Sequence, residues 1–192
     1  MNDSFKATHV QLFEKAKLSL PQQLSDWDLK IESWCQEYIN NNHEAEISEI
    51  IIDFAVFLFD HKKERVVVAY ALSVEQLLAR DSTRMRGFPD VNASMANQKK
   101  ENKFVADKGH FLGHASGGIL DINLFPQRRE LNRGWSEQGK QFRKMERCVA
   151  NNLWTFFYHR PIYDDNTWIP NKLEYGILVE NLKWWIEKFD NK

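Results

Sequence analysis

The segment from Asp107 to Trp135 contains side chains suited to metal-assisted hydrolysis. An imidazole titrates near neutral pH and can take a proton from water, and His110 supplies one. An amide oxygen suits Mg²⁺, which keeps most of its waters and accepts few protein ligands, and Asn132 supplies that oxygen. A base and a hard cation on opposite sides of a phosphate are what phosphodiester hydrolysis requires. The pattern therefore predicts a phosphodiesterase site that uses Mg²⁺ or Mn²⁺.

The order of motifs in this segment resembles the DNA/RNA non-specific endonucleases of the ββα-metal (His-Me finger) group, and in particular their toxin-type members. The motifs are Asp-Lys-Gly-His (107–110), a Gly-rich turn (113–118), Asn-x-x-Pro-Gln (123–127), Leu-Asn-x-Gly-Trp (131–135) and Lys-Met-Glu (144–146). The resemblance covers roughly residues 62 to 178 and is strongest from 105 to 147. Each motif alone is weak, but the ordered set is fairly specific.

The resemblance implies a role for each matching residue. His110 would be the general base, Asn132 the direct metal ligand, and Asn123 a supporting residue near the metal or its waters. Glu146 would orient metal-bound water, although its spacing from Asn132 is longer than in the family. We expect Asp107 and His114 to support these residues from behind; a lone His four residues after the base is more often structural than catalytic.

Phosphoryl transfer also needs a cation on the non-bridging oxygens. The basic loop that precedes the motifs offers Arg84 or Arg86, again by resemblance, and solvated loop arginines are an equally good interpretation. Lys108 stands where the family has Arg, and this exchange loses the bidentate fork for phosphate. We expect the nucleic-acid backbone to meet a sequence-independent basic surface. Its members are Lys108, Arg128, Arg129, Arg133, Lys140, Arg143, Lys144 and Arg147.

The formal net charge of −1 argues by itself against a nucleic-acid-binding protein. The distribution of charge changes this view, because residues 1–60 have a net charge of −7 and the remaining residues a net charge of +6. Such asymmetry indicates a polyanion-facing half, although a solvated surface explains it nearly as often. DNA, with RNA as a second substrate, is therefore the expected partner.

The sequence predicts an α+β fold, with an antiparallel sheet, flanking helices and a ββα-metal motif. Apolar spacing predicts helices from Thr8 to about Leu18 and from Ser25 to Asn40. The apolar run 47–59 and the segment 65–71 predict a hairpin of the central sheet. Strands are expected at 104–106, 119–122, 153–158 and 173–179, with a helix from about Glu130 and a packed segment at 182–189. We divide the chain into an acidic helical extension, 1–45, packed on a nuclease domain, 46–192.

Cys35 and Cys148 lack metal-binding spacing and are expected to be reduced. No apolar run has the length of a membrane span, and the N-terminus lacks the apolar stretch of a signal peptide. We therefore expect a soluble chain made in the cytoplasm, with delivery outside the cell by a route other than Sec as an option. Since a sequence-tolerant nuclease endangers its own cell, an inhibitor or immunity protein is a second expected partner.

Two other interpretations of the site stay open. The first is a nuclease-like domain that has lost activity and binds nucleic acid or a protein, favoured by Lys108 and by the displaced Glu146. The second is a transition-metal site built on His110 and His114, which predicts tight Zn²⁺ binding.

Overall fold

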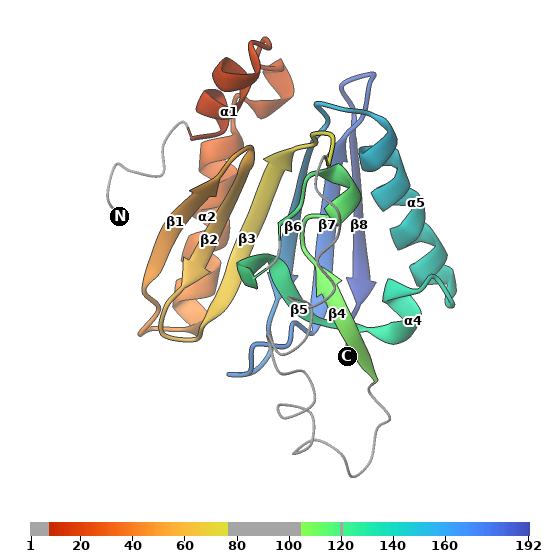
Figure 1. Cartoon of the computed structure of the whole chain (residues 1–192). Coiled ribbons are helices and arrows are strands. Elements are labelled where there is room, and N and C mark those ends of the chain that lie inside the picture. The colour runs from red at the N-terminus through yellow and green to blue at the C-terminus, as the bar shows by residue number, and fades with distance from the viewer. Residues whose placement is uncertain (1–7, 77–104, 120) are drawn as a thin grey trace.

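The computed structural model describes residues 8–76, 105–119 and 121–192. A six-stranded antiparallel sheet with the order β1-β2-β3-β6-β7-β8 forms the middle layer, and β4 and β5 form a separate two-stranded sheet (Figure 1). The strands are β1 Ile47–Ile52, β2 Ala55–Asp60, β3 Arg65–Leu72, β4 Ala106–His110, β5 Leu124–Arg128, β6 Phe156–Ile162, β7 Lys172–Leu178 and β8 Trp184–Asp190. The helices are α1 Thr8–Ala16, α2 Trp27–Asn41, α4 Arg129–Asn132 and α5 Glu137–Asn151, with short 3-10 turns η2 Gln22–Leu24, η3 His114–Ser116 and η4 Asp121–Asn123.

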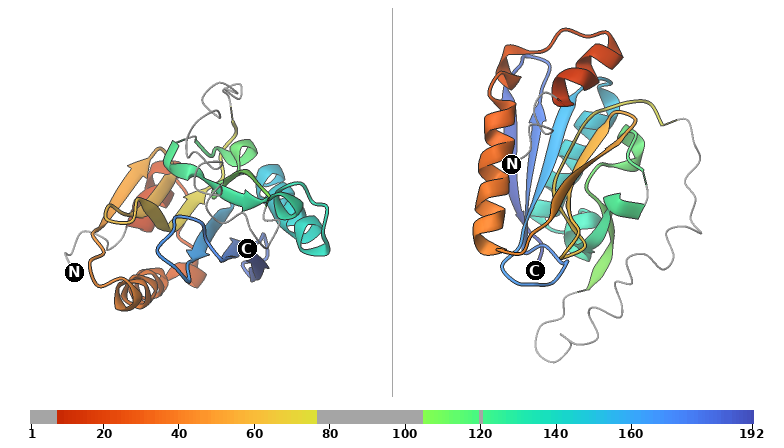
Figure 2. Two further views of the ribbon diagram at one scale, coloured as in Figure 1. Left: turned by 90° about the horizontal axis from the view of Figure 1, so that it is seen from below. Right: turned by 90° about the vertical axis from the view of Figure 1, so that its left-hand side faces the viewer.

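The large sheet is covered on both faces, as the views from below and from the side in Figure 2 show. The helices α1 and α2 lie on one face, and the unit formed by β4, β5, α4 and α5 lies on the other. This burial explains why the central strands are almost continuously hydrophobic instead of alternating. All eight residues of β3 are buried, with Ala69 and Ala71 on the β4–β5 side and Tyr70 and Leu72 on the α1–α2 side.

The two N-terminal helices pack through aromatic side chains. Trp27 is 1% exposed, and its ring meets Phe156 edge-on and lies parallel to Trp184. The ammonium group of Lys30 lies over the rings of Trp27, Trp34, Tyr158 and Trp184. Cation–π contacts of this kind fix the helix in place while it also buries apolar area. The acidic N-terminal piece is thus one outer layer of the fold.

A buried polar network around Arg65 joins α2, β2 and the loop before β7. The guanidinium donates to the hydroxyl of Tyr38, to the side-chain oxygen of Asn42 and to the carbonyls of Asp165 and Thr167. Tyr38 in turn donates to Asp60. A buried charge is tolerated when its donors are paired in this way.

The sequence-based boundaries need correction in four places. The strand expected at 119–122 is wrong, because residues 121–123 form the turn η4 and β5 begins at Leu124. The apolar run 47–59 is two strands, because the chain turns at Asp53, which has a left-handed φ of 53°. Pro126 and Gln127 lie inside β5 and do not end it. The packed segment near the C-terminus is the edge strand β8. The helices predicted from Thr8 and near Ser25 are confirmed as α1 and α2.

Pro126 is accommodated in a strand because, among the residues that the structure describes, no strand pairs with the outer edge of β5. Asn191 takes that place: its side-chain oxygen accepts from the Arg128 N–H, and its amide nitrogen donates to the carbonyls of Pro126 and Pro170. Proline is tolerated at such an edge, since no ladder hydrogen bond is lost there. The penultimate residue of the chain therefore holds β5 in position.

Candidate active site

The predicted base is at the end of β4. His110 is the last residue of that strand, pairs with Leu124 of β5 and is 8% exposed. The next ring in the chain, Phe111, stacks on Phe125 with centroids 4.2 Å apart. Because β4 is paired and its end is anchored by this stack, the imidazole is attached to a rigid element.

A close contact with a neighbouring side chain explains why residue 109 of the Asp-Lys-Gly-His motif is a glycine. A Cβ at this position would overlap the Cβ and Oε1 of Gln127, which is 1% exposed beneath β4. The side chain of Gln127 thus occupies the space that the missing Cβ leaves. This allows β4 to approach β5 closely at the residue before His110.

Asn123 controls the two residues that follow His110. Its carbonyl accepts from the Phe111 N–H, its Oδ1 accepts from the Leu112 N–H at 2.7 Å, and its Nδ2 donates to the carbonyls of Leu112 and Ile119. Asn123 has no exposed surface, and its amide oxygen is directed at the backbone. In this arrangement the side chain of Asn123 fixes the loop after His110.

Asp107 connects β4 to α4. Its carboxylate accepts from Arg129 Nε at 3.0 Å, from both Nε and Nη2 of Arg133, and from Asn132 Nδ2 at 3.5 Å. Partial burial raises the pKa of Asp107, but the hydrogen bonds from Arg133, Arg129 and Asn132 outweigh this effect and hold the pKa below its usual value. The carboxylate is therefore charged and fully engaged at neutral pH.

Asn132 is half-buried at the end of α4. Since its Nδ2 faces the carboxylate of Asp107, its amide oxygen points to the opposite side. A neutral oxygen donor in this position suits a hard divalent cation that keeps most of its waters. The residues present therefore fit Mg²⁺ or Mn²⁺.

Glu146 comes from α5, and α5 packs against η3. Its carboxylate accepts from Arg143 at 2.9 Å, and its other oxygen lies beside Gly113, 3.8 Å from where a Cβ on that glycine would be. The structure thus brings Glu146 to the loop after His110, although the two are far apart in sequence. His114 opens η3 in the same loop.

The cationic residues expected to bind phosphate differ in their partners and in their exposure. Arg128 is exposed and pairs with Glu130, Arg129 and Arg133 bind Asp107, and Lys108 is a half-buried residue of β4 opposite Pro126. Arg84 and Arg86 lie outside the described residues. The exposed face of α5 adds Lys140, Arg143, Lys144 and Arg147.

Three or four protein ligands are usual for zinc. Within the ranges that the structure covers, no three His, Cys, Asp or Glu side chains gather in a way that could hold a metal ion. Nor does any described helix have the length and apolar character to cross a membrane.

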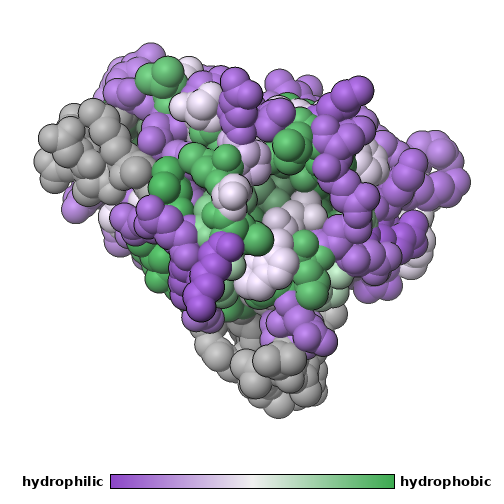
Figure 3. All heavy atoms as spheres, turned by 90° about the horizontal axis from the view of Figure 1, so that it is seen from above, coloured by the Kyte–Doolittle hydropathy of each residue, from purple (hydrophilic) through white to green (hydrophobic). Residues whose placement is uncertain are grey.

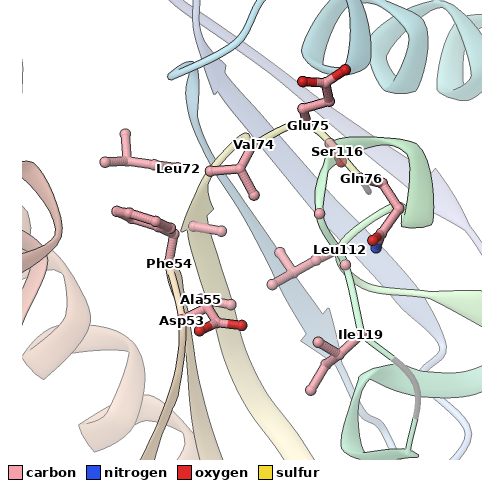
Figure 4. A pocket seen from close by; sticks show the side chains of 13 residues that line it. Asp53, Phe54, Ala55, Leu72, Val74, Glu75, Gln76, Leu112, Ser116 and Ile119 are labelled. Carbon is pink, nitrogen blue, oxygen red and sulfur yellow. The ribbon is translucent and has the colours of Figure 1, made fainter. Parts of the chain in front are cut away.

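Two cavities lie at the end of the molecule where β2 begins and β3 ends. One, of about 230 Å³, is lined by residues including Phe54, Leu72, Leu112 and Ile119, with Leu112 and Ile119 pointing from the turn towards β2 and β3 (Figure 4). The other, of about 410 Å³, lies between α1, the start of β6 and the β7–β8 turn. Seen from above, hydrophobic side chains surround a hollow at this end (Figure 3). None of the predicted site residues within the described ranges lines either cavity.

Similarity to known proteins is found among solved structures. No family model matches the sequence. No curated protein matches it either. One similar chain is found in a crystal structure of the EndoG/EndoGI complex that concerns the mechanism of EndoG inhibition. The similarity has a TM-score of 0.42 and 16% sequence identity, and it covers 75% of this chain and 74% of that chain. At this TM-score the match does not establish a shared fold, so the functional argument depends on the residues of the site.

Asn191 has no local signal in the sequence, because it acts through contacts with distant residues. Asp107 and Gln127 belong to the motifs, but the sequence does not show which residues of other segments they contact. The Gly in the Asp-Lys-Gly-His motif was the one available signal of a close approach, because glycine is the residue that leaves space for a neighbouring side chain.

Proposed function

We propose that this chain is a Mg²⁺-dependent endonuclease that hydrolyses phosphodiester bonds of DNA, with RNA as a second substrate, and that it is of the toxin or effector type. The observation that carries the proposal is the unit formed by β4, β5 and α4. His110 is the last residue of the paired strand β4, and Asn132 is the last residue of α4. Asp107 of β4 binds the amide nitrogen of Asn132, which leaves the amide oxygen for a metal.

In the proposed reaction His110 accepts a proton from the attacking water, and the water oxygen bonds to phosphorus as the bond to the leaving oxygen breaks. Asn132 would hold the metal, with Glu146 orienting its waters. The bound cation would neutralise charge on the phosphate and stabilise the leaving oxygen. Asn123 keeps the loop after His110 fixed, and the strand pairing of β4 holds the base.

Positive side chains would supply the rest of the binding. Arg128 and the exposed basic residues of α5 can meet backbone phosphates, which gives binding without sequence preference. Arg84 or Arg86 is the proposed cation on the reacting phosphate. Cleavage should therefore weaken steeply as the salt concentration rises.

The test is cleavage of supercoiled plasmid with Mg²⁺, with and without EDTA, by the purified chain and by His110→Ala. Loss of a general base costs about 10²-fold to 10⁴-fold in rate. His43→Ala is the matched control, because it removes the same group from an exposed position between α2 and β1, and it should retain the rate within a few-fold. If the unaltered chain cuts neither plasmid nor RNA with Mg²⁺ or Mn²⁺, the proposal fails.

The alternative is a nuclease-like domain without activity that binds nucleic acid or a protein. The observation that favours it is the engagement of Arg129 and Arg133 by Asp107, which leaves fewer donors for phosphate. This alternative predicts salt-dependent retention of labelled DNA without cleavage in any divalent metal.

An inhibitor or immunity protein is the proposed protein partner, because uninhibited cleavage would harm the producing cell. Expression of the active chain alone should reduce growth, and expression of His110→Ala should not. Equal growth with both chains would count against this partner.

A further inference from the structure

We infer that Asp107 is a positioning residue that sets which end of the Asn132 amide faces the metal, an inference that rests on the proposed function. The amide of asparagine has one oxygen and one nitrogen that differ little in shape. Only the oxygen can bind a cation, so the proposed metal site works in one of the two amide orientations.

The neighbours of Asn132 select that orientation. An ionised carboxylate accepts hydrogen bonds and donates none, so Asp107 pairs with the nitrogen end of the amide and turns the oxygen outward. Arg129 and Arg133 bind both oxygens of Asp107 and hold the carboxylate at α4. Asp107 is 14% exposed as a side chain, which limits competition from water.

Replacing Asp107 by asparagine tests this polarity with almost no change in volume. The new amide can accept from an arginine with its oxygen and direct its NH₂ group at residue 132. The oxygen of Asn132 would then turn inward to accept that hydrogen bond. Residues that orient a metal ligand typically contribute about 10-fold to 100-fold to metal affinity. We therefore expect Asp107→Asn to weaken Mn²⁺ binding by at least about tenfold.

The probe is Mn²⁺ alone, followed by the loss of the free-ion electron paramagnetic resonance signal on titration with protein. The unaltered chain should bind Mn²⁺, and Asn132→Ala should abolish binding. Asp165→Asn is the matched control, because Asp165 is also a carboxylate held by a cation, Lys192, and lies in the loop before β7. It should leave Mn²⁺ affinity unchanged.

Making Asp107→Asn in a chain that also carries Asn132→Asp distinguishes a role in orienting residue 132 from damage to the fold. In Asn132→Asp the ligand has two equivalent oxygens and no polarity to orient. In this background Asp107→Asn should therefore cause no loss of Mn²⁺ affinity. It should even raise the affinity, because it removes the negative charge of Asp107 from beside the new carboxylate at position 132. A loss of affinity that is equal in both backgrounds would overturn the positioning role.

The remaining outcomes distinguish the two proposals. If the unaltered chain binds no Mn²⁺, the metal site and the role of Asp107 both fail. If the chain binds Mn²⁺ through Asn132 and Asp107→Asn binds it equally well, the inference fails while the proposed function stands.

Discussion

Asn123 gives the sharpest test of how the site is built. Its amide makes three hydrogen bonds with buried backbone groups, two as donor and one as acceptor. Asn123→Asp keeps the size of the side chain and the acceptor for the Leu112 N–H. It replaces the NH₂ group with an oxygen that faces the carbonyls of Leu112 and Ile119. The substitution therefore removes two donors and adds repulsion without opening a cavity.

The magnitude follows from the contacts. At about 1 kcal/mol per hydrogen bond, Asn123→Ala should lower the free energy of unfolding by about 3 kcal/mol. This corresponds to a fall in Tm of about 6–12 °C for a chain of this size. Asn123→Asp should lose at least as much at neutral pH, because a buried carboxylate next to two carbonyls is costlier than a missing group.

The pH dependence of Asn123→Asp gives an independent check. The introduced carboxyl is buried beside two acceptors, so its folded-state pKa should be raised above the unfolded value of about 3.9. A raised pKa stabilises the fold below the unfolded pKa, and this contribution is lost as the pH rises towards the folded pKa. Relative to the unaltered chain, the free energy of unfolding should therefore fall by about 1.4 kcal/mol for each pH unit between about 4 and the folded-state pKa of the new carboxyl, and stay level above it.

The assay is urea unfolding followed by circular dichroism between pH 4 and 8, with the unaltered chain measured at each pH. Asn181→Asp is the matched control, because Asn181 is exposed and only accepts a hydrogen bond from Lys183 at 3.3 Å. Its stability should stay within about 0.5 kcal/mol. The reasoning is refuted if Asn123→Asp is as stable as the unaltered chain at pH 7 and shows no added pH dependence.

Three further predictions concern the surroundings of the site and the scaffold. Gly109→Ala should lower the free energy of unfolding by about 1–3 kcal/mol through overlap with Gln127. Gln127→Gly in the same chain removes both the Cβ and the Oε1 that overlap, and it should recover part of the loss in a thermal melt. Burial lowers the pKa of His159 to about 3, and a backbone hydrogen bond with Phe111 opposes this effect only in part. The free energy of unfolding should therefore fall by about 1.4 kcal/mol per pH unit as the pH falls from about 6.5 towards 3. His159→Phe should abolish this pH dependence when unfolding is measured in acid. Arg65→Met should lower the free energy of unfolding by about 3 kcal/mol in urea, since it removes a buried guanidinium and leaves three part-buried oxygens unpaired, whereas Arg147→Met on the exposed face of α5 should cost less than about 0.5 kcal/mol.

Much of the secondary structure could be predicted from the sequence. The spacing of Leu12, Phe13, Ile31 and Trp34 predicts the helices α1 and α2, and these residues are buried as expected. Strands with apolar residues on both faces are harder to place, because continuous hydrophobicity carries no period from which to locate a turn. For this reason the run 47–59 was expected as one strand, while the structure has β1, a turn at Asp53 and β2.

The sequence alone determined which chemical groups are available: an imidazole in a Gly-His pair, amide oxygens at 123 and 132, and a basic segment after them. Only the tertiary structure decided how they are used. Asn123 and Asn132 are the same residue type, yet the first is enclosed by the backbone of the loop after His110 and the second has its oxygen turned away from Asp107. The physical reason is that a buried amide takes the partners its surroundings offer, and these partners are fixed by contacts between segments distant in sequence, such as Arg128 with Asn191.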